Sequence, residues 1–276
     1  MEVSNTTSQQ NTTTDTLLPH SSINENGHDT ILLLHGGGST RSSWDAVVSH
    51  IPPTYHILIP DLPSHGAASS IKPFTLSTCT SHLAPLILAK AHKSRTHLVG
   101  ISIGAYCAID LATNYPQLVS SVFASGYNRF TPSPFTPLLG TAAYGLNRLP
   151  DLLPKAVTKY FMDGIDVTGG DDSNSPSYPL HREFMALLFS GTWPAPWGAR
   201  TVIVAATKGG IVPSFDRVDV ARRLAEICVQ GGNKEVRSVQ YKGMRHPWNA
   251  QDPKLFADAL CAFIERRALP DGFEEI

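Results

Sequence analysis

The feature that most constrains the fold is an alternation between short apolar runs and longer helix-like stretches. The runs are rich in β-branched and aliphatic residues and almost continuously hydrophobic, which is typical of strands buried on both faces of a parallel sheet. The predicted strands are Thr30–His35, His56–Pro60, Thr96–Ile101, Val119–Ala124, Thr201–Ala206 and Val236–Tyr241. The predicted helices are Ser43–Ile51, Thr75–Lys93, Gly104–Tyr115, Phe215–Gln230 and Pro253–Arg267. This order predicts an α/β fold with a mostly parallel, doubly wound sheet.

The alternation stops between Tyr127 and Arg200, over a stretch that is too long for an ordinary loop. Two helical segments, Leu152–Met162 and Leu180–Leu188, flank a polar hinge that runs from Gly169 to Pro176. We interpret residues 127–199 as a helical cap inserted between two strands of the sheet. A decorated surface excursion is the alternative interpretation.

The two segments on either side of this insertion, residues 28–126 and 200–270, are expected to form one core. Hydrophobic residues make up 42% of the 276 residues, which is enough to fill it. The preceding residues, 1–27, begin with a Ser/Thr/Asn-rich stretch and are expected to form a disordered polar leader. That leader lacks the basic and apolar regions of a secretory signal, so we predict a cytoplasmic protein.

Charge excludes some classes of partner. Only 16% of the residues are charged, and 22 basic residues stand against 23 acidic ones, so a nucleic-acid-binding surface is not expected. No apolar run approaches the ~20 residues of a membrane span.

The cysteines have neither metal nor redox spacing and are expected to be reduced core thiols: Cys79, Cys107, Cys228 and Cys261. The expected partner is a small molecule, and the oligomeric state stays open.

The residues that carry chemistry begin with Gly100-Ile101-Ser102-Ile103-Gly104. In a G-x-S-x-G turn, the glycines let a strand and a helix pass close to a serine in a strained turn. The serine hydroxyl then lies at a helix N-terminus, whose dipole favours developing negative charge. An apolar strand precedes this motif and a small-residue helix follows it, as the geometry requires.

Two further pieces lie where a serine nucleophile would need them. The glycine-rich loop after the first predicted strand, Gly36-Gly37-Gly38, can direct backbone N–H groups at an oxyanion, with Gly37 and Ile103 as the donors. His246 follows the last predicted strand, so it is expected at the carboxyl edge of the sheet, where an imidazole can act as a base. The histidines show no clustering typical of metal ligands, and no cofactor is expected.

Together these motifs resemble the α/β-hydrolase superfamily, and the resemblance covers about residues 28–268. The matching features are the His35-Gly36-Gly37 loop, Trp44, the turn Pro60–Gly66, the elbow at Ser102, the inserted helical segment and His246. The resemblance implies an α/β-hydrolase core with a cap. It also implies that Ser102 is the nucleophile and His246 the general base, with Gly37 and Ile103 in the oxyanion hole.

The sequence departs from the family at the acid of the triad. Aligning Ile211-Val212-Pro213 with the family's usual turn puts Gly209 at the position of the acid. Asp216 is the nearest carboxylate that could replace it, if the glycines let the loop fold back. The alternative for Asp216 is that it lies in the first turn of a helix and complements its dipole; Asp219, one turn further, is a weaker candidate.

Aromatic residues suggest the substrate. Trp193, Trp197 and Trp248 make an apolar pocket under the cap credible, although each could equally serve packing. The leading hypothesis is therefore a serine hydrolase that cleaves a carboxylic ester, lactone or thioester of a small to medium apolar substrate. Because of Gly209, two alternatives stay open: a lyase, cyclase or isomerase on the same fold, and a ligand receptor without catalysis.

Overall fold

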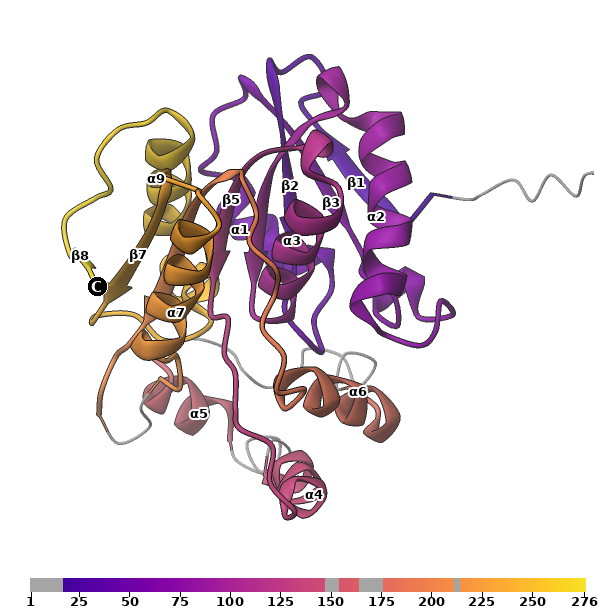
Figure 1. Cartoon of the computed structure of the whole chain (residues 1–276), viewed down its shortest axis with the longest axis vertical. Coiled ribbons are helices and arrows are strands. Elements are labelled where there is room, and N and C mark those ends of the chain that lie inside the picture. The colour runs from indigo at the N-terminus through magenta and orange to yellow at the C-terminus, as the bar shows by residue number, and fades with distance from the viewer. Residues whose placement is uncertain (1–16, 147–153, 164–175, 211–213) are drawn as a thin grey trace, which may run out of the picture.

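Eight strands form one sheet in the computed structural model, which describes residues 17–146, 154–163, 176–210 and 214–276 (Figure 1). They pair in the order β1-β3-β2-β4-β5-β6-β7-β8. Their bounds are β1 His20–Ile23, β2 Asp29–Leu34, β3 Tyr55–Pro60, β4 Thr96–Ile101, β5 Val119–Ser125, β6 Arg200–Ala206, β7 Val236–Tyr241 and β8 Phe273–Glu275. The pairs from β3 to β7 are parallel, whereas β1 and β8 lie antiparallel on the two edges.

The six predicted strands are all present, with bounds that differ by one residue at most, and the predicted parallel sheet is confirmed. The edge strands were missed because each is too short for its pattern to stand out. The prediction of a disordered leader to residue 27 is wrong from Leu17 onward. Leu18 is only 1% exposed, and His20–Ile23 pair with β3. Residues 1–16 lie outside the described part.

Helices cover both faces of the sheet, because successive strand residues point to opposite sides. Leu32 and Leu34 of β2 lie on the face of the sheet that α2 (Leu76–Lys90), α3 (Ile103–Asn114) and α7 (Val218–Gln230) cover. Ile31 and Leu33 lie on the opposite face, which α1 (Asp45–Val48), α8 (Trp248–Gln251) and α9 (Pro253–Ile264) cover. Short 3-10 turns occur at 41–44, 66–68, 92–94 and 116–118. The doubly wound arrangement is confirmed.

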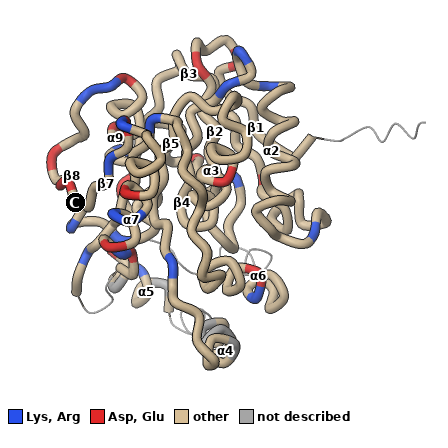
Figure 2. Tube along the Cα trace, in the orientation of Figure 1, with Lys and Arg blue, Asp and Glu red and all other residues tan. Residues whose placement is uncertain are grey.

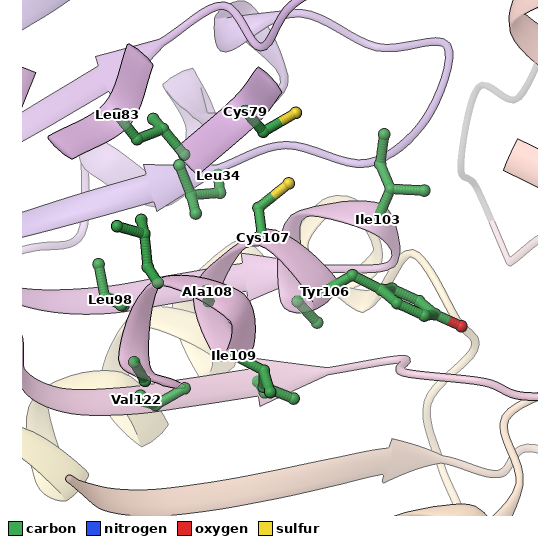
Figure 3. Packing of buried hydrophobic residues seen from close by; sticks show 14 of the residues in the cluster. Leu34, Cys79, Leu83, Leu98, Ile103, Tyr106, Cys107, Ala108, Ile109 and Val122 are labelled. Atoms are coloured by element: carbon green, nitrogen blue, oxygen red, sulfur yellow. The ribbon is translucent and has the colours of Figure 1, made fainter. Parts of the chain in front are cut away.

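The layer that holds α3 against the sheet is densely packed (Figure 3). Cys107 and Ala108 of α3 lie over Leu34, Leu98 and Val122 of three neighbouring strands, and Cys79 of α2 faces Cys107. All four cysteines are free and buried, as predicted for core thiols. This packing fixes the start of α3 relative to the ends of β2 and β4.

Between β5 and β6, the described residues form three helices beyond one end of the sheet: α4 (Thr136–Leu146), α5 (Lys155–Phe161) and α6 (Tyr178–Leu188) (Figure 1). Of these, α4 was not predicted, and most of the predicted hinge lies outside the described residues. α6 packs on the core through Phe184, whose ring lies 5.6 Å from that of His65 and 5.3 Å from that of Phe74. The role of residues 127–199 as a cap stays a prediction.

Along the chain trace in Figure 2, basic and acidic residues are interspersed rather than gathered by sign. Within the described residues, no helix combines the length and the apolar character that crossing a membrane requires.

Candidate active site

Ser102 lies in the tight turn between β4 and α3, as its motif predicts. Its backbone angles are φ +55° and ψ −124°, a conformation that non-glycine residues rarely adopt. Both motif glycines are needed for close packing. A Cβ at Gly100 would stand 2.2 Å from the carbonyl oxygen of Gly104, and a Cβ at Gly104 would stand 2.2 Å from that of Leu34. The sequence therefore forms the strained strand-to-helix turn that exposes a serine hydroxyl.

His246 and Asp216 are in direct contact. The Nδ1 atom of His246 lies 2.5 Å from Oδ1 of Asp216, and the Asp216 side chain is only 1% exposed. The other carboxylate oxygen accepts a hydrogen bond of 2.9 Å from the backbone N–H of Ala206, the last residue of β6. The carboxylate is thus fixed at the carboxyl end of β6, where it can orient the imidazole and stabilise its protonated form.

Backbone hydrogen bonds hold the described residues that lead from β6 to Asp216. The N–H of Thr207 donates to Tyr241 and that of Lys208 to Met244, while the N–H of Ser214 donates back to Lys208. The predicted helix from Phe215 is wrong at its start: α7 begins at Val218, so Asp216 precedes the helix and does not cap its first turn.

The neighbouring carboxylate, Asp219, stands apart from this arrangement. It lies on the surface with its side chain 63% exposed, paired with Arg217. The structure therefore separates two carboxylates that are three residues apart in the sequence.

Two residues after β5 complete the surroundings of this pair, and sequence reasoning missed both. Asn128 is buried; its amide group donates to Oδ1 of Asp216 at 3.4 Å, and its oxygen accepts from the N–H of Arg217 at 3.1 Å. Gly126, at φ +70°, has no room for a side chain, since a Cβ there would stand 2.5 Å from Cε1 of His246. The sequence signal that could have found them is a glycine and an asparagine at the carboxyl end of a central strand.

Ser102 and His246 line the same cavity of about 340 Å³, together with Gly36 and Gly37. Ile103 is the first residue of α3, so its N–H has no partner within the helix and is free to meet a ligand. Gly37 is required by packing, because a Cβ there would stand 2.9 Å from the Phe184 ring. Both predicted oxyanion donors thus belong to segments that border the serine.

The three tryptophans predicted to form the pocket, Trp193, Trp197 and Trp248, do not line this cavity. Trp248 is fully buried on the α9 side of the sheet, where its ring lies 4.4 Å from Phe256 and its N–H donates to the Ser125 hydroxyl. The pocket role predicted for Trp248 is wrong, because the core needs this large side chain. The ring of Trp193 lies 5.4 Å from the guanidinium of Arg129.

Two histidines near the site, His35 and His65, hold backbone turns in place. Nδ1 of His35 donates to the carbonyl of Gly36 at 2.8 Å, and its Nε2 accepts from the N–H of Leu62 at 3.0 Å. Complete burial lowers the pKa of His35 to about 3, so this ring is neutral. His65 uses its Nε2 to accept from the N–H of Gly38, and burial lowers its pKa as well.

Asp163, just after α5, connects the helices between β5 and β6 to the loops that carry Asp216 and His246. Its carboxylate pairs with Lys208 at 2.9 Å and also with Arg245, the residue before His246. The hydrogen bond from Lys208, followed by the contact with Arg245, lowers the pKa of Asp163 below its usual value. One carboxylate therefore holds both loops.

Comparison with known proteins places this geometry in a family. The sequence model of the "Alpha/beta hydrolase family" matches residues 31–259. An "AB hydrolase superfamily protein" of Gibberella zeae is 40% identical over 266 residues, 95% of this chain and 89% of that protein. A "Pimeloyl-[acyl-carrier protein] methyl ester esterase" of Neisseria meningitidis is 30% identical over 120 residues, 43% of this chain and 44% of that protein.

Solved structures agree on the fold. A "Putative non-heme bromoperoxidase BpoC" of Mycobacterium tuberculosis superimposes with a TM-score of 0.64 at 20% identity, over 90% of this chain and 96% of that one. A "thermophilic esterase" of Thermogutta terrifontis gives 0.67 at 15% identity, over 90% and 93%. With a family match over most of its length and the sheet described above, this chain belongs to the alpha/beta hydrolase family.

Proposed function

We propose that the protein is a serine hydrolase that cleaves a carboxylic ester, lactone or thioester. The observation that carries the proposal is the contact between the buried carboxylate of Asp216 and Nδ1 of His246, in a cavity wall shared with Ser102. A histidine held in this way presents its Nε2 as a base, which is what a serine hydroxyl needs to become a nucleophile. Likeness to a relative named as a methyl ester esterase supports the same reaction class.

The reaction then proceeds in two halves. Oγ of Ser102 attacks the carbonyl carbon while Nε2 of His246 takes its proton, and the N–H groups of Gly37 and Ile103 bind the oxyanion that forms. Collapse of this intermediate expels the alcohol or thiol, which receives the proton from His246. Water, deprotonated by His246, next attacks the acyl-serine and releases the acid. Throughout, Asp216 holds the Nδ1 proton and stabilises the imidazolium.

The non-hydrolytic alternatives, a lyase-type enzyme and a ligand receptor, were motivated by the glycine at position 209. The carboxylate of Asp216 lies beside Nδ1 of His246, and this contact supports the hydrolase over both alternatives.

A fluorophosphonate probe tests the mechanism, because it forms a stable adduct only with an activated serine. We expect mass spectrometry to map the adduct to Ser102, and we expect both labelling and hydrolysis of p-nitrophenyl butyrate to disappear in Ser102→Ala and in His246→Ala. Ser43 lines the same cavity and serves as the control, since Ser43→Ala should retain both. Undiminished hydrolysis by Ser102→Ala would refute the proposal.

A further inference from the structure

A second cavity, of about 470 Å³, adjoins the one that holds Ser102 and His246. Ser39, just after the glycine-rich loop, lines both cavities, so the two are neighbours that share this residue as a wall. The second cavity lies between this loop, the segment 64–72 and the first turns of α6. A substrate with its carbonyl at Ser102 could extend past Ser39 into this space.

The walls of the second cavity are polar, and some of their groups already have partners. The hydroxyl of Ser64 donates to the carbonyl of Ile71, and the carboxylate of Glu183 accepts from the N–H of Phe74 at 2.9 Å. Lys72 also lines the cavity, and its ammonium group has no ion pair or hydrogen bond with any residue of the described part. It is therefore the positive charge in the described lining that can meet a ligand, whereas Glu183 supplies a negative charge to the same wall.

The surroundings of Lys72 leave it as the group that would attract an anion. The N-terminus of α6 also lies at the cavity wall, but Ser177 caps the N–H of Leu180 and Pro179 has no N–H, so this helix end adds little to Lys72. The negative charge of Glu183 is partly compensated by the N–H of Phe74. The contact of His65 with Gly38 and the stacking of its ring on Phe184 hold the wall in place without a ligand.

We propose that this second cavity binds the part of the substrate remote from the scissile bond, and that this part carries a carboxylate that pairs with Lys72. The inference rests on the proposed function and deepens it. It also changes the expectation of an apolar substrate: the ester would be apolar near the carbonyl and anionic at its far end. Either the acyl chain or the alcohol could reach the cavity, and the chemistry at Lys72 is the same for both.

Matched esters test the proposal. In the acyl arm, the mono-p-nitrophenyl ester of glutaric acid is compared with p-nitrophenyl valerate, which has the same chain length and no charge. In the alcohol arm, the valerate ester of 4-hydroxybenzoic acid is compared with that of 4-hydroxybenzamide. In one of the two arms, Lys72→Met should lower kcat/KM for the anionic ester about three- to five-fold by raising KM. This is the loss expected when a partly exposed ion pair is removed. Lys72→Met should leave kcat/KM for the matched neutral ester unchanged, and Lys72→Arg should retain most of the preference for the anionic ester.

Equal effects of Lys72→Met on charged and neutral esters in both arms would overturn the proposal. To separate this from a failure of the hydrolase mechanism, calorimetry measures the binding of one anionic ligand per arm, monomethyl glutarate and the valerate ester of 4-hydroxybenzoic acid, to Ser102→Ala and to Ser102→Ala/Lys72→Met. We expect the double variant to bind one of these ligands more weakly even where no ester is turned over. Equal binding of both ligands by the two variants, or none by either, would refute the anion subsite, whereas Ser102→Ala that still hydrolyses esters would refute only the mechanism.

Discussion

Replacing Asp216 by Asn is the change that most directly tests the site. The substitution keeps the shape of the side chain and leaves an oxygen for the N–H of Ala206, but it removes the charge beside Nδ1 of His246. At about 4 Å between charge centres and an effective dielectric constant of about 20, that charge stabilises the imidazolium by about 4 kcal/mol. Since each 1.4 kcal/mol is a factor of ten in rate, kcat should fall about 10³-fold.

A change in the tautomer of His246 adds to this loss of kcat. An amide can offer its NH₂ group to Nδ1 of His246, which then carries no proton, so that Nε2 is protonated and cannot act as a base. In the serine-protease template, the same Asp→Asn change costs about 10⁴ in kcat, so we expect a loss between 10³ and 10⁴ for Asp216→Asn.

The assay is the hydrolysis of p-nitrophenyl butyrate at saturating substrate, with thermal unfolding to confirm that the variant is folded. Asp219→Asn is the matched control, because Asp219 lies three residues away, exposed and paired only with Arg217 among the described residues. Its kcat should stay within about two-fold of the wild type. A folded Asp216→Asn that keeps more than a tenth of the wild-type kcat would refute the reasoning.

Three further predictions concern the surroundings of the site. Asn128→Ala removes the amide that links Asp216 to the N–H of Arg217 and should lower kcat about ten-fold with little change in KM; a rise in KM alone would contradict a positioning role. Gly104→Ala forces a Cβ against the β2 backbone and should lower the free energy of unfolding by about 1–3 kcal/mol, measured by urea denaturation; unchanged stability would show that the turn can relax. His35 has a folded-state pKa of about 3 against 6.5 in the unfolded chain, so the unfolded state binds more protons between these values. Stability should fall by about 1 kcal/mol per pH unit below pH 6.5, with a shallower slope in His35→Gln; identical slopes would contradict this account.

Sequence reasoning found those features that depend on local pattern. The central strands are buried on both faces, so their hydrophobicity is continuous and their bounds were predicted closely. The turn at Ser102 was equally accessible, because close packing on both sides of the serine demands glycine at positions 100 and 104.

What could not be predicted depends on contacts between distant segments. The place of Asp216 depends on backbone hydrogen bonds from residues 207 and 208 to the last residue of β7 and to the loop after it, which no local pattern reveals. Trp248 was assigned to the pocket because it lies two residues after His246, yet the turn after His246 carries its side chain into the core. Asn128 was overlooked because a partner of the histidine is expected to be a carboxylate, and the side chain of Asn128 is an uncharged amide.

The contacts of Asp163 bear on how this architecture could change during evolution. Its carboxylate comes from the region between β5 and β6, but the cations that it holds, Lys208 and Arg245, belong to the two loops of the Asp216–His246 pair. A chimera that exchanged residues 127–199 for the corresponding region of a relative would take away the negative charge that both cations share. The insertion is therefore not an interchangeable module, and only donors with a carboxylate at the same place would suit these loops.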